Sequence, residues 1–220
     1  MKNIILQHFT GELRPLDRLS ISNITRYCHK IGVEYELVLG QAFREHLTPP
    51  CQKVCLLDER FDRYDNVLML DIDMFATRDL SDNVFDIEPG IGLHVQTQQM
   101  LLSRMVSHYR LRPQSAYWGG SFYKMDRETR IKLRSFIPKD DSWMDLYNKP
   151  YHFEDEGIMA ELYHKAGYTD TKYIDRRWCQ CSFLPEHVPG FIHIRTKITP
   201  AGPKREKLAN YDHLVSKEII

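Results

Sequence analysis

The sequence predicts an α/β protein with a mainly parallel central sheet flanked by helices, built as a single domain. Three observations lead to this prediction: the length, the hydrophobic content, and the alternation of strand-like and helix-like segments. The chain has 220 residues, of which 42% are hydrophobic, and this is enough to bury the core of one large domain. Strand and helix patterns alternate in its first third, as they do in βαβ units.

Three short apolar runs, each followed by a turn or by polar residues, predict strands over 4–6, 35–39 and 66–70. The first of them leads into a predicted loop over 8–11. Between the first two strands, apolar residues recur at helical spacing from Pro15, and Gly32 stands at the position of a C-cap. A second predicted helix over 48–65 opens at Thr48 and keeps one apolar face.

The second half of the chain has a less regular pattern. It contains runs that predict strands over 91–95, 121–123 and 191–194. It also contains stretches that predict helices over 99–109, after Asp126, and over 154–166. The tail beyond Pro200 is polar, and we expect it to be loosely held.

Composition excludes several classes of protein. Lys and Arg together number 30, as do Asp and Glu, so the formal net charge is zero; this argues against binding nucleic acid through a basic face. No apolar run exceeds four residues, too short for a membrane span. Residues 1–8 are too short for a signal peptide. Five cysteines argue against a disulfide framework and favour a cytoplasmic protein.

Two acidic residues follow the third predicted strand directly. Asp71 and Asp73 lie at its carboxyl end, the place where parallel α/β sheets bind ligands. In an extended chain, residues two positions apart face the same side. Carboxylate oxygens suit Mg²⁺ or Mn²⁺, and an ion held there could bridge to a diphosphate. The alternative is that both are ordinary turn or helix-capping acids.

The sequence around this pair resembles a known family. A basic residue, Lys53, precedes Tyr64-Asp65, a strand, and the Asp71-Ile72-Asp73 motif. This order is similar to the core of GT-A glycosyltransferases, which are nucleotide-sugar-dependent enzymes with an Asp-x-Asp motif, and most of all to their glycogenin-like retaining members. The compact chain is also similar to the small glycosyltransferase domains encoded by large algal viruses, which would place it in a host cytoplasm.

Three later segments match the same family in order, so that the resemblance covers about residues 2–200. Residues 118–122 resemble an Asn-Ala-Gly-Val-Phe stretch, and Asp155-Glu156 resemble an Asp-Gln pair. His193 resembles a late His, with Lys197 in place of a phosphate-binding Lys. The chain departs from the family at the Asn, at the Gln, and in the Gly-x-x-Lys-Pro-Trp ending, where residues 195–200 differ.

The resemblance implies a GT-A-like fold in which residues 1–95 bind the nucleotide sugar and metal, and residues 96–220 shape the acceptor site. It implies Mn²⁺ or Mg²⁺ as cofactor, a UDP-sugar as donor, and a glycan hydroxyl that receives a hexose-type unit. The chain would be either a complete protein or one domain of a longer polypeptide. The implied metal ligands are Asp71, Asp73 and His193. The implied donor-binding residues are His8, Phe9, Thr10, Arg14, Lys53, Ile72, Gly119, Gly120, Glu156 and Lys197.

Asp155 is the candidate catalytic residue, with two roles open to it. In an inverting enzyme it would be the general base on the acceptor hydroxyl. In a retaining enzyme, which the glycogenin-like pattern favours, the leaving diphosphate could accept that proton, and Asp155 would orient the sugar.

Three other interpretations compete with glycosyl transfer. In a haloacid-dehalogenase-like phosphatase, Asp71 would be the nucleophile and Asp73 the general acid; that family expects Thr where Phe75 stands and carries the motif on its first strand. A non-catalytic GT-A-like domain could bind a nucleotide sugar without turnover. A zinc site could use Cys51, Cys55, Cys179 and Cys181, but their spacing does not fit the common sites, so buried thiols are expected.

Overall fold

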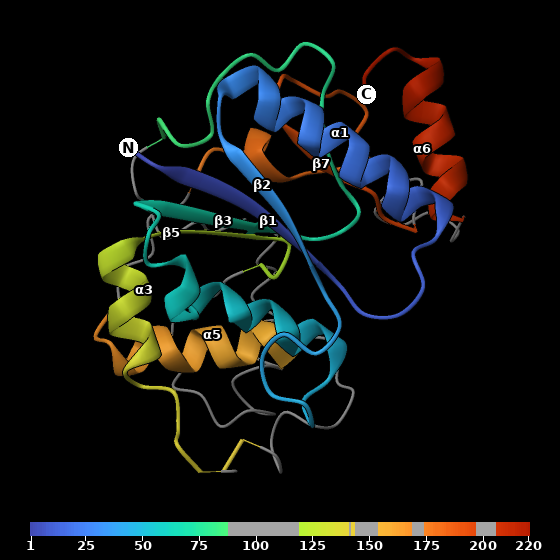
Figure 1. Cartoon of the computed structure of the whole chain (residues 1–220). Coiled ribbons are helices and arrows are strands. Elements are labelled where there is room, and N and C mark those ends of the chain that lie inside the picture. Colours follow the sequence, from blue (N-terminus) through green and yellow to red (C-terminus); the bar gives the residue numbers. More distant parts are fainter. Residues whose placement is uncertain (88–118, 141, 144–153, 169–173, 197–205) are drawn as a thin grey trace.

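The computed structural model describes residues 1–87, 119–140, 142–143, 154–168, 174–196 and 206–220. Helices lie on both faces of a central sheet (Figure 1), so the predicted α/β class is confirmed. The strand predicted over 91–95 and the helix predicted over 99–109 lie outside the described residues.

The central sheet has four strands in the order β2-β1-β3-β5. They are β1 (Asn3–Phe9), β2 (Glu34–Leu39), β3 (Asn66–Leu70) and β5 (Phe122–Asp126). β1 pairs in parallel with β2 and β3, whereas β5 is antiparallel to β3. The mainly parallel sheet is therefore confirmed. β1 is longer than the predicted run and includes His8 and Phe9, because the ladder to β2 continues to the pair Phe9 and Leu39.

A second, three-stranded sheet lies beside the first and was not predicted as a sheet. It has the order β4-β7-β6, formed by β4 (Met74–Ala76), β7 (Phe191–His193) and β6 (Gln180–Cys181). β4 and β7 are antiparallel, with Met74 opposite His193. This pairing brings the end of the Asp71–Asp73 segment against a strand from the last part of the chain.

One face of the central sheet is covered by α1 (Pro15–Ile31), as the sequence predicts (Figure 1). Pro15 is its first residue, and Gly32 ends it with a φ of 71°, in the left-handed region that glycine adopts without strain. Ile24 and Tyr27 of this helix pack with Ile5 of β1 in one buried cluster.

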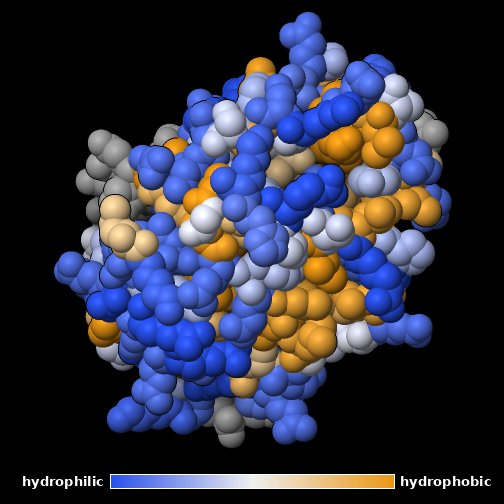
Figure 2. All heavy atoms as spheres, turned by 45° about the horizontal axis from the view of Figure 1, so that its top comes forward, coloured by the Kyte–Doolittle hydropathy of each residue, from blue (hydrophilic) through white to orange (hydrophobic). Residues whose placement is uncertain are grey.

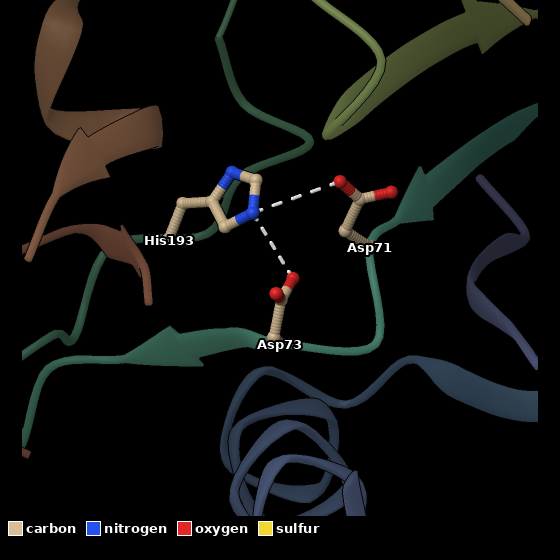
Figure 3. A group of neighbouring side chains, drawn as sticks. All are labelled: Asp71, Asp73 and His193. Carbon is tan, nitrogen blue, oxygen red and sulfur yellow. Dashed lines mark ion pairs between the residues drawn. The ribbon is translucent and has the colours of Figure 1, made fainter. Parts of the chain in front are cut away.

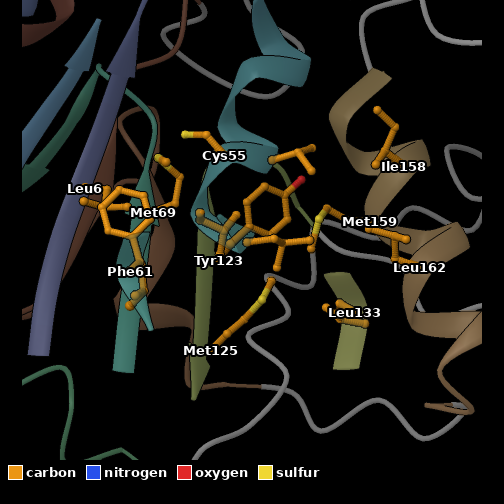
Figure 4. Close-up of a cluster of buried hydrophobic side chains, with 14 of the residues drawn as sticks. Leu6, Cys55, Phe61, Met69, Tyr123, Met125, Leu133, Ile158, Met159 and Leu162 are labelled. Carbon is orange, nitrogen blue, oxygen red and sulfur yellow. The ribbon is translucent and has the colours of Figure 1, made fainter. Parts of the chain in front are cut away.

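The opposite face is covered by four helical segments: η1 (Pro49–Leu57), η2 (Glu59–Phe61), α3 (Arg127–Arg134) and α5 (Glu154–Lys165). Figure 4 shows side chains of this core, among them Leu6, Met69, Tyr123 and Leu162. The single helix predicted over 48–65 is wrong. Residues 49–61 form the two 3-10 segments η1 and η2 instead. They are separate because Asp58 is extended and its carboxylate accepts a hydrogen bond from Arg60 N at 2.9 Å.

The helices predicted after Asp126 and over 154–166 are confirmed, and each has an end signal that the sequence contains. Asp126 caps α3 by accepting a hydrogen bond from Thr129 N at 2.7 Å. α5 is followed by Gly167, whose φ is 79°. Both features were visible in the sequence, because a capping Asp and a terminal Gly act through local geometry alone.

The expectation of a loosely held tail is wrong for residues 207–216. They form α6 (Lys207–Ser216), whose Leu214 is buried in a cluster with Leu16, Phe75 and Ile192. The short η3 (Arg176–Cys179) precedes β6. The polar composition of the tail concealed α6 because only one narrow side of this helix is buried.

Two further expectations, on the cysteines and on membrane-spanning segments, can be compared with the structure. All five cysteines are buried thiols, and the one cluster of potential metal ligands among the described residues contains none of them. None of the helices in the described ranges combines the length and apolarity needed to cross a membrane. The face shown in Figure 2 is mostly hydrophilic, with scattered apolar areas.

Candidate active site

Asp71 and Asp73 lie in a tight turn between β3 and β4. Met74 N donates to Asp71 O at 3.2 Å, so the two carboxylates meet through a turn and not, as predicted, through an extended chain. The turn is held from two other elements. Gln7 Nε2 of β1 donates to Asp71 O at 3.0 Å, and Ser20 Oγ of α1 donates to Met74 O at 2.6 Å.

His193, at the end of β7, completes a cluster with these two acids (Figure 3). Its Nε2 lies 3.0 Å from Asp73 Oδ1 and 3.8 Å from Asp71 Oδ2. One potential ligand atom from each of the three residues lies within 4.8 Å of the others. Two carboxylate oxygens and one imidazole nitrogen form a donor set that fits Mn²⁺ or Mg²⁺. The structure thus brings together the three predicted metal ligands.

The electrostatics of the cluster favour the protonation states that bind metal. Burial alone would raise the pKa of Asp73, but His193 and Lys207 hold that pKa well below its usual range. Burial lowers the pKa of His193. An ionised carboxylate and a neutral imidazole both present lone pairs, as metal ligands must.

Lys53 connects this cluster to a second acidic group. Its Nζ, on η1, lies 2.7 Å from both Asp71 Oδ1 and Asp155 Oδ2 and donates to Gly120 O at 2.6 Å. Burial opposes the charge on Lys53, but Asp155 and Asp71 outweigh it and raise the pKa of this ammonium above its usual value. A permanently charged ammonium therefore joins the two carboxylates.

Asp155 and Glu156, in the first turn of α5, face the segment that precedes β5. Tyr123 Oη donates to Asp155 Oδ2 at 3.0 Å, and Gly120 N donates to Glu156 Oε1 at 2.7 Å. Burial raises the pKa of Asp155, while Lys53 opposes this rise. A Cβ at Gly120 would lie 2.6 Å from Asp155 Oδ2, so a larger residue there would displace the Asp155 carboxylate.

The residues predicted to bind the nucleotide gather at the carboxyl end of β1. His8 Nε2 lies 2.8 Å from Gly40 O, and Thr10 Oγ1 donates to the same oxygen at 3.3 Å. Burial lowers the pKa of His8, so its ring is neutral near pH 7. Arg14 makes two hydrogen bonds of 3.0 Å to Asp17, and its guanidinium lies 6.0 Å from the centre of the Phe9 ring.

Three predicted site residues remain: Ile72, Gly119 and Lys197. Ile72 is half-buried in the Asp71–Asp73 turn. Gly119 immediately precedes Gly120, and its carbonyl accepts from Phe122 N at 3.4 Å. Lys197 lies outside the described residues.

Four residues that join the site were not predicted: Gln7, Ser20, Tyr123 and Lys207. Lys207, the first residue of α6, makes an ion pair with Asp73. Gln7 gave a usable signal, because a polar residue inside an otherwise apolar buried strand needs a partner. Lys207 gave none, since a lysine in a polar tail is ordinarily solvated.

The sequence matches no family model and no curated protein, but solved structures share its fold. A glycosyltransferase involved in the glycosylation of the major capsid of PBCV-1 aligns with a TM-score of 0.58 and 12% identity, over 98% of this chain and 100% of that chain. The galactosyltransferase LgtC, solved with donor and acceptor sugar analogues, aligns at 0.54 and 13% identity, over 97% and 95%. GlyE of Streptococcus pneumoniae aligns at 0.51 and 11% identity, over 99% of this chain and 64% of its own.

These likenesses show that the chain has the GT-A fold, as the resemblance implied. The position of Asp71 in the chain argues against the phosphatase alternative, which expects its nucleophile on the first strand. Here Asp71 follows β3, in a turn that leads into β4.

Proposed function

We propose that the protein is a metal-dependent glycosyltransferase that moves a hexose-type unit from a UDP-sugar to a glycan hydroxyl. One observation carries the proposal: Asp71, Asp73 and His193 form a metal-binding set beside the Lys53–Asp155 pair, at the ligand-binding edge of a GT-A fold. The similar fold of LgtC, which was solved with donor and acceptor sugar analogues, supports this reaction class.

The chain's own residues would divide the work as follows. Asp71, Asp73 and His193 would hold Mn²⁺ or Mg²⁺, which when bound supplies Lewis-acid stabilisation of a departing diphosphate. Lys53, buried and charged, pairs with Asp71 and adds positive potential in a water-poor region. The end of β1 and the residues after it, with His8, Phe9, Thr10 and Arg14, would receive the nucleoside, and Lys197 would serve its phosphates.

Asp155, with Glu156 and the Gly119–Gly120 segment, would face the donor sugar. Asp155 Oδ2 is already engaged by Lys53 and Tyr123, which fixes the carboxylate in place. A rigidly held carboxylate suits orientation of a sugar and stabilisation of positive charge at its anomeric carbon. We therefore propose the retaining course, in which the acceptor proton passes to the leaving diphosphate. The anomeric configuration of the product, read by proton NMR, tests this choice.

The function as a whole is tested by calorimetric titration with UDP, with and without Mn²⁺. For the wild-type protein we expect measurable affinity for UDP only when Mn²⁺ is present. For Asp73→Asn we expect that adding Mn²⁺ no longer raises the affinity for UDP. Asp79→Asn is a matched control, because Asp79 is an exposed acid six residues further along the chain. Affinity for UDP that ignores the metal would contradict the proposal.

A screen of UDP-, GDP- and dTDP-sugars separates an enzyme from a binding domain. We expect slow hydrolysis of one UDP-sugar with Mn²⁺, and faster release of UDP when the acceptor is added. Tight donor binding without any release of UDP would favour the non-catalytic alternative.

A further inference from the structure

α6 packs on β4, which follows the Asp71–Asp73 turn, and on β7, which ends at His193. The ring of its Tyr211 is 5.0 Å from that of Phe75 in β4. Its Asn210 Nδ2 donates to Arg195 O, two residues beyond His193, at 2.6 Å. At the start of the same helix, Lys207 reaches the carboxylate of Asp73. The helix therefore docks on the frame of the site and extends a cation into it.

Both oxygens of Asp73 are engaged in this arrangement. Oδ1 lies 3.0 Å from His193 Nε2, and Oδ2 accepts from the ammonium of Lys207. The Asp73 side chain is 8% exposed and that of Lys207 is 33% exposed, so the pair is partly shielded from water. The first acid of the motif, Asp71, is paired with Lys53. Each acid of the motif thus already has a protein ammonium as counter-ion.

A divalent cation held by the carboxylates of Asp71 and Asp73 would meet the Lys207 ammonium at close range. Two like charges a few ångströms apart in a partly buried site repel strongly. The ammonium must then move away from Asp73. A lysine side chain at a helix start, one-third exposed, has the conformational freedom to do so.

We propose that Lys207 is a tethered counter-cation that competes with the divalent ion for Asp73 and, once displaced, pairs with the diphosphate of the nucleotide. Lys207 then favours binding of the ion together with a nucleotide over binding of the ion alone. The ion alone must break the Lys207–Asp73 pair without compensation. An ion that arrives with a nucleoside diphosphate brings new anionic oxygens for the ammonium. The second half of this inference rests on the proposed function; the first half does not.

The test compares Lys207→Gln with wild type in two titrations. For Mn²⁺ alone, followed by electron paramagnetic resonance of the unbound ion, we expect the variant to bind about three- to tenfold more tightly. For UDP at saturating Mn²⁺, followed by calorimetry, we expect the variant to bind about tenfold more weakly, the loss of one charge-assisted contact. Opposite signs in the two titrations are the signature of the proposed exchange.

Two further variants serve as controls. Lys207→Arg keeps the charge and should behave as wild type in the Mn²⁺ titration. Lys217→Gln removes an exposed lysine beyond the other end of α6 and should change neither affinity. Far-ultraviolet circular dichroism checks that each variant keeps its helix content.

Unchanged affinity of Lys207→Gln for Mn²⁺ alone would overturn the inference. So would tighter Mn²⁺ binding combined with unchanged UDP binding, because the exchange requires both changes. If wild type binds no UDP under any condition, the proposed function fails, while the Mn²⁺ titration still decides whether Lys207 competes with the ion.

Discussion

Lys53 is the side chain that joins the two acidic parts of the site. Its ammonium contacts Asp71 on one side and Asp155 on the other, and the Lys53 side chain is only 9% exposed. Removal of one partner of a buried ion pair leaves a charge without compensation, which costs more than the intact pair contributes. The residue is therefore expected to matter for folding as well as for the site.

We expect Lys53→Met to lower the free energy of unfolding by about 3–5 kcal/mol, because two carboxylates lose their shared counter-ion. The double variant Lys53→Met/Asp155→Asn should recover part of this loss, since it removes one of the stranded charges. Urea unfolding of the three proteins measures both effects. A double variant less stable than Lys53→Met would contradict this account of the pair.

Gly120 imposes a steric requirement of a different kind. A Cβ at this position would lie 2.6 Å from Asp155 Oδ2 and 3.2 Å from Lys53 Nζ. We expect Gly120→Ala to displace Asp155 and to reduce transfer by about 10²-fold, as misplacement of a positioning group does. Donor hydrolysis and transfer assays measure this, with thermal unfolding as the check that the fold is kept.

The matched comparison for Gly120→Ala is a double variant. If Gly120 acts through Asp155, then Asp155→Ala adds little further loss in the Gly120→Ala background. Full additivity of the two losses would show that Gly120 acts by another route.

At the scale of elements, the sequence predicted those whose signals are local. The helix from Pro15 to the glycine cap, the strand over 66–70 and the helix that Asp126 opens all follow from residues adjacent in the chain. β4 and β6, of three and two residues, were not predicted. They exist only through pairing with β7, a contact distant in sequence.

The residues of the candidate site also divide into those that the sequence indicates and those that join the site only through tertiary contacts. Asp71 and Asp73 were found because a strand-end acidic pair is a compact motif, and His193 and Asp155 were found through the family resemblance. Lys207 and Tyr123 enter the site through tertiary contacts alone. No spacing in the sequence predicts that a helix start will reach a turn more than one hundred residues away.

α6 supplies a prediction at the scale of one element. Leu214 is 2% exposed and fixes the helix to the cluster that contains Phe75 and Ile192. We expect Leu214→Ala to weaken the docking of α6 by about 2–5 kcal/mol. Amide hydrogen exchange in α6 should accelerate, and Mn²⁺ alone should bind more tightly, as in Lys207→Gln.

Leu208→Ala is the matched control in the same helix, because Leu208 is 41% exposed and its truncation removes little buried surface. Faster exchange in Leu214→Ala without any gain in Mn²⁺ affinity would separate the docking of α6 from the metal site.

At the scale of the whole molecule, burial protects the cysteine side chains from thiol reagents in solution. All five cysteines are buried, and burial raises the pKa of Cys28, Cys51, Cys55 and Cys179 to about 12. The thiolate is the reactive form, so at pH 8 these four groups are protonated as well as inaccessible.

We therefore expect the native protein to react slowly with a chromogenic disulfide reagent, and the protein unfolded in guanidinium to release five equivalents at once. A reductant should leave the midpoint of thermal unfolding unchanged, since no disulfide contributes to stability. Rapid release of even one equivalent from the native protein would contradict the burial of these side chains.

The register of β4 and β7 has a consequence for biosynthesis. Met74 stands opposite His193, so one rung of an antiparallel ladder holds His193 beside the Asp71–Asp73 turn. A nascent polypeptide that has emerged from the ribosome only as far as α5 possesses the Asp71–Asp73 turn but no His193. In the proposed function, capture of a divalent cation by the complete triad must therefore await synthesis of the chain through β7.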